Sequence, residues 1–137
     1  MIEYIINNSN GSLVYQTNSM TQSNKNNLSL IKQMCLDALF SYEGYLKAFQ
    51  KKFGKVYRIP IYIDEEHMFI PIKRTRDFDN IWINYAAIHD INHGGNKIEL
   101  IFESKQNLHI NISFKSLKRQ IMYLEAIQNT KVKHFHF

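Results

Sequence analysis

The sequence has a single cysteine, Cys35, and no long apolar run, and both shortages limit what the protein can be. One cysteine excludes an intramolecular disulfide framework, and no stretch approaches the roughly 20 apolar residues that a membrane-spanning helix needs. The first residues, MIEYIINNSNG, lack the basic region, the apolar stretch and the cleavage site of a secretory signal. We therefore expect a cytoplasmic protein without a membrane partner.

Catalytic motifs are also missing. The sequence has no glycine-rich phosphate loop, no nucleophile elbow and no pair of residues spaced for acid–base chemistry. His89 and His93 have the spacing of two zinc ligands on a helix, but they continue a strand-like pattern into Gly94-Gly95, so we expect no metal site there. The charged residues 64–67 are typical of a solvated turn. We expect neither an enzyme nor a bound cofactor.

Two residue types that often mark functional sites are better explained here as core. Cys35 lies on the apolar stripe of an expected helix, where a free cysteine behaves as a small hydrophobe. The only tryptophan, Trp82, lies in a strand-like run, where packing in a core is commoner than stacking on a base. Neither residue predicts a site by itself.

Positive charge is what the sequence does have. Its 137 residues carry a net charge of +5, and a chain of this length is expected to form one domain. Apart from Lys25 and Lys32, every basic residue lies at or after Lys47. Such a charge favours an acidic partner, which can be nucleic acid, an anionic membrane surface or an acidic protein.

The beginning of the chain predicts a hairpin and then a helix. Two strand-like runs flank Asn10-Gly11, a dipeptide typical of tight hairpin turns. Residues 16–27 are polar and without periodicity, which predicts a loop. Apolar residues then recur at helical spacing, and Asn27 or Ser29 is available as the N-cap.

The middle of the chain predicts a second helix followed by strands. Residues 42–53 place tyrosine and phenylalanine side chains on one helical face, and Gly54 is a plausible end for the helix. Three β-rich runs follow, at residues 56–63, 68–72 and 80–91.

The last third predicts a hairpin and a final helix. Alternating apolar residues at 97–103 and 108–113 indicate the hairpin, and helical spacing continues from there to about residue 128. We expect residues 1–128 to form one α+β domain, with a mostly antiparallel β-sheet, two N-terminal helical segments and one C-terminal helix. Residues 129–137 are expected to be a tail.

The segment FIPIKRTRDFDNIWIN, residues 69–84, bears most directly on function. It contains two apolar runs joined by a loop with three cations, Lys73, Arg74 and Arg76. Pro71 should confine the first run to a sheet edge or a bulge, because proline cannot donate to a β-ladder. A short cationic arm of this kind can reach the backbone or the minor groove of DNA. Charge alone favours an ordinary solvated hairpin loop, so both interpretations stay open at this point.

Four short blocks of the sequence share their order and spacing with one known family. In chain order they are Cys35 six residues before SYEG (41–44), RIPI (58–61), FIP ending at Pro71 with Trp82 eleven residues later, and NISFKSL (111–117) with Gln120 downstream. Through these blocks the chain resembles the ComK competence transcription factors over residues 1–128.

The resemblance implies a cytoplasmic DNA-binding regulator. ComK proteins recognise paired A·T-rich boxes largely through the minor groove, bind as dimers that associate into a tetramer, and activate DNA-uptake genes. The adaptor MecA delivers them to the ClpCP protease. For this chain the resemblance implies that Arg76 enters a narrow, negative minor groove, and that Lys73 and Arg74 contact phosphates. A lysine row on the second helix would add phosphate contacts, and its members are Lys47, Lys51, Lys52 and Lys55.

The chain also departs from the family pattern. Tyr45-Leu46 replaces a basic pair, Leu36 replaces an arginine, and Ile72 replaces a threonine. Relatives continue beyond the last helix into a part associated with adaptor recognition, so a MecA-like partner is left open for a sequence whose last residue is Phe137. Fewer cations weaken the electrostatic term in DNA affinity. The alternative hypothesis is therefore a divergent paralogue that pairs with or modulates a fuller relative and binds DNA weakly. A third hypothesis is an unrecognised enzyme or ligand-binding protein.

Overall fold

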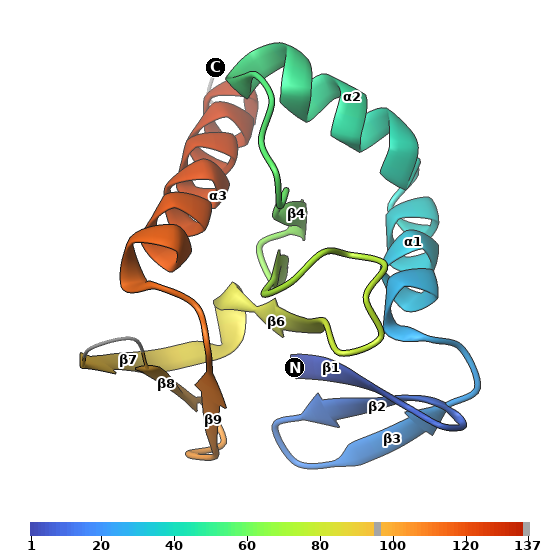
Figure 1. Ribbon diagram of the computed structural model, residues 1–137. Coiled ribbons are helices and arrows are strands. Elements are labelled where there is room, and N and C mark those ends of the chain that lie inside the picture. The colour runs from blue at the N-terminus through green and yellow to red at the C-terminus, as the bar shows by residue number, and fades with distance from the viewer. Residues whose placement is uncertain (95–96, 136–137) are drawn as a thin grey trace.

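The computed structural model of the chain describes residues 1–94 and 97–135 (Figure 1). Within them the chain folds into two antiparallel sheets and three α-helices, which confirms the predicted α+β class. In chain order the elements are β1 (Ile2–Asn8), β2 (Gly11–Gln16), β3 (Met20–Ser23), α1 (Asn27–Asp37), α2 (Tyr42–Phe53), β4 (Ile61–Asp64), β5 (His67–Pro71), β6 (Ile81–Asn84), the 3₁₀ turn η1 (Tyr85–Ala87), β7 (Ile88–Gly94), β8 (Lys97–Phe102), β9 (Asn107–Ile110) and α3 (Phe114–Phe135).

The central strands of the larger sheet are buried on both faces. The strand order of this sheet is β3-β2-β1-β6-β5-β4, and successive residues of its central strands belong to different core clusters. On β1, for example, Tyr4 packs in one cluster and Ile5 in the other, and on β6 Ile83 and Trp82 divide in the same way. This division follows from the two-residue period of a strand, which alternates side chains between the faces of a sheet.

Different elements cover the two faces. Ile31 and Cys35 of α1 and Phe49 of α2 pack against one face, in the cluster that contains Trp82. The second sheet, β7-β8-β9, and α3 cover the other face through residues such as Phe102. Figure 1 shows α2 with its first turn beside α1 and its last turn beside the C-terminal end of α3.

The predicted helix at residues 42–53 and its end at Gly54 are confirmed. Gly54 ends α2 with a positive φ of 83°. Ser41, which was not predicted as a cap, caps the start of α2 by accepting a hydrogen bond from the Gly44 N–H. The predicted burial of Trp82 and Cys35 is also correct, since both side chains are fully buried. Burial raises the pKa of the Cys35 thiol to about 11, so the thiol is protonated and unreactive at neutral pH.

The predicted loop at residues 16–27 is wrong in its middle. Strand β3 lies there and pairs with β2 through the backbone, from Ser12 with Ser23 to Tyr15 with Met20. Its side chains are mostly exposed, so the strand has no apolar alternation for sequence reasoning to detect. The N-cap of α1 is Asn26, which accepts a hydrogen bond from the Ser29 N–H at 2.8 Å, and neither Asn27 nor Ser29.

The expectations for the strand region also need correction. The regular strand within residues 56–63 begins only at Ile61, and residues 80–91 are not one strand. The Asn84 side chain accepts a hydrogen bond from the Ala86 N–H, which starts the turn η1 and sends the chain into the second sheet as β7. His89 and His93 therefore lie on a strand, as expected, and the described residues contain no cluster suited to a metal ion. Gly95 lies outside the described residues.

Pro71 is not on an edge strand. It is the last residue of β5, which lies between β4 and β6 and pairs with Trp82 of β6 at this point. Along β5, the ladder with β4 ends at Phe69, so no neighbour on the β4 side needs a donor from Pro71. A proline is therefore accommodated at the end of a ladder as well as on an edge strand.

The expected tail at residues 129–137 belongs largely to α3. Ser113 caps this helix by accepting a hydrogen bond from the Ser116 N–H, and the helix continues to Phe135. Residues 136–137 are outside the described residues. In the part of the chain that the structure describes, none of the helices is long and apolar enough to cross a membrane.

Candidate nucleic-acid interface

The cationic loop between β5 and β6, residues 72–80, is fixed at its base by one buried side chain. Asn80 is fully buried, and its Oδ1 accepts hydrogen bonds from the backbone N–H groups of Ile72 at 3.0 Å and Lys73 at 2.9 Å. The loop also closes on itself, because the Asp77 N–H donates to the Arg74 carbonyl and the Asn80 N–H donates to the Asp77 carbonyl. These bonds hold both ends of the loop in register.

Three other segments hold the loop from outside. Asn7 donates to the Phe78 carbonyl at 3.0 Å, and Asn27 donates to the Asn80 carbonyl at 2.7 Å. The Arg58 guanidinium donates to the Ile72 carbonyl at 2.6 Å and to the Ser116 hydroxyl of α3 at 2.8 Å. A loop held by this many bonds needs little ordering when it meets a ligand.

The cations of the loop differ in their partners. Lys73 forms an ion pair with Asp79, and Arg74 forms one with Asp77 at 3.1 Å. The hydrogen bond from Lys73 lowers the pKa of Asp79, and the bond to Asp77 raises the pKa of Arg74. Arg76 is exposed, and no carboxylate of the described residues lies within ion-pair distance of it.

The loop lies against the beginning of α2. Burial raises the pKa of Tyr42, while hydrogen bonding by Thr75 and the charge of Arg76 act in the opposite direction, which places both loop residues near the phenol. In Figure 1 the loop, drawn in yellow-green, extends from β5 and β6 toward α1. Thr75 and Arg76 therefore lie near the start of α2, where α1 and α2 meet.

Two exposed aromatic side chains accompany the arginines, and the sequence analysis missed both. Tyr57 is 81% exposed and lines a surface cavity of about 370 Å³ with Arg74, Thr75 and Arg76. Phe78, which follows Asp77 in the loop, is 66% exposed. Phe78 lies outside the predicted apolar runs, between Asp77 and Asp79, and this polar setting is the signal that could have identified it. Tyr57 lies within the β-rich run predicted at residues 56–63, so no comparable signal in the sequence indicated its exposure.

The structure does not bring the whole lysine row of α2 to this loop. Lys52 points to the opposite neighbour, α3, where its Nζ donates to the Thr130 hydroxyl at 2.9 Å. Lys47, Lys51 and Lys55 are exposed, and no hydrogen bond or ion pair within the described residues connects them to the loop. The seven predicted contact residues thus divide into a loop group and a helix group.

A basic α+β domain that presents arginines and an exposed aromatic ring on a fixed loop, with a second exposed ring beside it, has the features of a protein that binds a polyanion. A comparison with protein-family models identifies the family. The model described as ComK protein matches residues 1–133, so the chain belongs to the ComK family, a family of competence transcription factors. The resemblance found in the sequence is thereby confirmed. No curated protein and no solved structure matches the chain.

Proposed function

We propose that this protein is a sequence-preferring DNA-binding regulator of competence genes, which contacts A·T-rich boxes through the minor groove with the loop at residues 72–80. Membership of the ComK family supports transcription regulation as the role. The net charge of +5 supports a nucleic acid as the partner. Paired boxes would be bound by a dimer or tetramer of the chain.

The observation that carries the proposal is the position of Arg76. It is a cation without a carboxylate partner among the described residues, and it lies on a loop whose base is fixed by Asn80. A·T-rich minor grooves are narrow and strongly negative, so they attract an arginine presented in this way. Guanidinium groups are also less strongly hydrated than ammonium groups, which lowers the cost of entering the groove.

Other loop residues have complementary roles in this proposal. Lys73 and Arg74 each pair with one carboxylate of the loop, and they would contact phosphates as those ion pairs open. The exposed Phe78 ring would press on the sugars or bases at the groove wall, as apolar side chains do in other minor-groove proteins. Lys47, Lys51 and Lys55 would add long-range attraction, and Lys52 less.

The decisive experiment is an anisotropy titration of the chain against duplexes with and without paired A·T boxes, repeated over a salt series. We expect tighter binding to the boxed duplex and a log K that falls linearly with log salt concentration, because phosphate contacts release counterions. Equal affinity for a random G·C-rich duplex would refute the proposal.

The loop itself is tested by replacing Arg74 and Arg76 together with Ala. We expect weaker binding and a smaller salt slope, with an unchanged circular dichroism spectrum, because both side chains are exposed. Lys97→Ala is the matched control, since Lys97 is exposed on β8 in the second sheet. An effect of the control as large as that of the loop variant would remove the loop from the site.

One observation favours a second function, that of a paralogue that modulates a fuller ComK-like protein. Asp77 and Asp79 already pair with two of the three loop cations, which reduces the attraction for phosphates. On this alternative the chain binds DNA weakly and forms a stable complex with its relative. Co-purification of the two chains tests it, and recovery of this chain only as a free monomer would count against it.

A further inference from the structure

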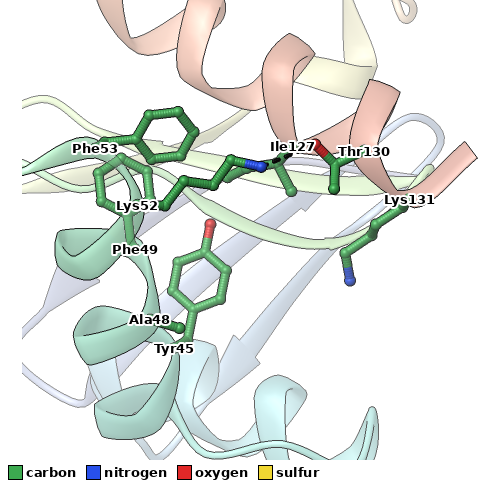
Figure 2. A pocket seen from close by; sticks show the side chains of 8 residues that line it. All are labelled: Tyr45, Ala48, Phe49, Lys52, Phe53, Ile127, Thr130 and Lys131. Atoms are coloured by element: carbon green, nitrogen blue, oxygen red, sulfur yellow. Dashed lines mark hydrogen bonds between the residues drawn. The ribbon is translucent and has the colours of Figure 1, made fainter. Parts of the chain in front are cut away.

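A second basic site lies away from the loop, between α2 and α3 (Figure 2). Here the two helices line an open surface cavity of about 390 Å³, which we call the α2–α3 cavity. Phe49 and Phe53 of α2 and Ile127 of α3 form its apolar wall, and Lys52 and Lys131 stand at its rim. Neither the family assignment nor the proposed DNA contact assigns a role to this cavity.

The wall of the cavity is apolar and rigid. The Phe49 and Phe53 rings each pack edge-on against Tyr123 of α3, with ring centroids 5.2 and 5.1 Å apart. Tyr45 contributes its ring, but its hydroxyl is already satisfied, because it donates to the Pro60 carbonyl and accepts from the Tyr62 N–H. The wall therefore offers a ligand apolar contact and few free polar groups.

The rim, in contrast, is cationic. The Lys52 Nζ bonds only to the Thr130 hydroxyl among the described residues, and that hydroxyl itself donates to the Ala126 carbonyl. The Lys131 Nζ lies over the Tyr62 ring, 5.1 Å from its centroid. No acidic residue lines the cavity, and the sequence contains none after Glu125. Within the part of the chain that the structure describes, the two ammonium groups beside this apolar surface therefore have no negative partner.

The size of the cavity distinguishes a small ligand from a protein partner. Small-molecule sites have volumes of roughly 300–1,000 Å³ and apolar walls with a few polar groups. A stable protein interface needs roughly 20–30 residues on each side, far more than line this cavity. A second cavity of about 460 Å³ continues from the first past Tyr45 and Ala48, which gives an elongated apolar body room to extend.

We propose that the α2–α3 cavity binds a small anionic amphiphile, with its apolar body against Phe49, Phe53 and Ile127 and its acidic head between Lys52 and Lys131. The ligand is defined by this chemistry: one carboxylate or similar anionic group on an aliphatic or aromatic body. The proposal does not depend on the proposed DNA contact, because it uses a different flank of α2.

The test compares three probes with one tail and different heads: decanoate, decanol and decyltrimethylammonium, each below its micelle concentration. Each probe competes with 8-anilinonaphthalene-1-sulfonate, an anionic dye that fluoresces in apolar sites. We expect saturable dye binding and displacement in the order decanoate, decanol, decyltrimethylammonium. No saturable binding, or equal displacement by all three probes, would overturn the proposal.

Three variants locate the site. Lys52→Met and Lys131→Met keep an unbranched stem and remove the charge. Each should weaken the binding of decanoate about two- to fivefold and leave the binding of decanol unchanged. Lys51→Met is the matched control, because Lys51 lies on the same helix but does not line the cavity. It should change the affinity for neither probe. A loss of decanoate affinity equal to that of Lys52→Met would contradict the assignment.

Ala48→Trp is the filling variant. Ala48 is exposed and lies where the two cavities meet, so the indole fills space without disturbing the core. We expect loss of decanoate and decanol binding with an unchanged melting temperature. Undiminished binding would place the ligand elsewhere. Displacement of the dye by an acidic amphipathic peptide at lower concentration than decanoate would make the cavity a protein-docking site and overturn the small-ligand assignment.

Discussion

The cationic loop and the α2–α3 cavity both present two or more basic side chains, but they surround them differently. In the loop, Lys73 and Arg74 face the carboxylates of Asp79 and Asp77. At the cavity, Lys52 and Lys131 face a hydroxyl group and aromatic rings. The loop therefore holds charge that is partly neutralised on a rigid support, while the cavity holds charge without negative partners beside apolar surface.

This difference shows why a count of basic residues is a poor guide to a binding surface. Within the loop, the cation suited to recognition is Arg76, because its neighbours Asp77 and Asp79 pair with the other two. A polyanion can compete for the paired cations, but only by replacing interactions that already exist. The unpaired lysines at the cavity meet no such competition, yet their apolar surroundings suit a small amphiphile better than a phosphate backbone.

The largest effect is expected from Asn80→Ala, which removes the support of the loop and leaves the cavity untouched. The Lys73 N–H loses its acceptor and the Ile72 N–H keeps only its longer bond to the Ile81 carbonyl at 3.3 Å, so stability should fall by about 2 kcal/mol. Urea unfolding measures this change. Asn107→Ala, at an exposed position on β9, is the control and should stay within about 0.5 kcal/mol of the wild type.

A loss of DNA affinity in Asn80→Ala without loss of dye binding at the cavity would confirm that the two regions work separately. Loss of both together, under conditions where the variant is folded, would show that the loop and the cavity are parts of one site.

The next effect separates the arginines of the loop. Arg76→Ala should weaken binding to the boxed duplex about tenfold, within the range of a good groove contact, whereas Arg74→Ala should weaken it only about twofold, since Asp77 already offsets that charge. Anisotropy titrations at one salt concentration measure both. The reverse order would show that ion pairing within the loop does not decide which cation binds.

Phe78→Ala tests the aromatic part of the loop. We expect affinity to fall about fivefold, at the lower end of what a ring contributes against a base, with no change in the salt slope. Met122→Ala is the matched control, because Met122 is a similarly exposed apolar side chain on α3. A salt slope that falls with Phe78→Ala would indicate a displaced loop rather than a lost ring contact.

The smallest effect is expected from neutralising the carboxylates of the loop. The double variant with Asp77→Asn and Asp79→Asn keeps their shape and releases Lys73 and Arg74, so DNA affinity should rise about threefold at low salt, which is the scale of exposed ion pairs. The gain should shrink as salt is added. Unchanged affinity at low salt would mean that only Arg76 meets the DNA.

Much of the fold follows from local patterns in the sequence. The helix at residues 42–53, its end at Gly54, and the hairpin of β8 and β9 all follow from apolar spacing and turn chemistry. Strand β3 does not, because it is held by backbone pairing and its side chains bury almost nothing. The break between β6 and β7 begins where the Asn84 side chain accepts a hydrogen bond from the Ala86 N–H, and no periodicity could reveal this bond.

The candidate site was predictable only in outline. The sequence placed Lys73, Arg74 and Arg76 on a loop between two strands, and the structure agrees. It could not show that Asp77 and Asp79 pair with two of them, or that Lys52 turns toward α3, because such pairings depend on how distant elements meet. The exposed rings of Tyr57 and Phe78 were passed over, since an aromatic residue usually indicates core.

The burial of Trp82 has a practical consequence. It is the only tryptophan of the chain, it is fully shielded from water, and it lies opposite Pro71 where the loop leaves the sheet. It also belongs to the same core cluster as Phe49, whose ring forms the wall of the α2–α3 cavity. The protein thus carries an intrinsic fluorophore in the core that connects the two regions. Increased quenching of the Trp82 emission by iodide in a variant would report that this shared core has opened.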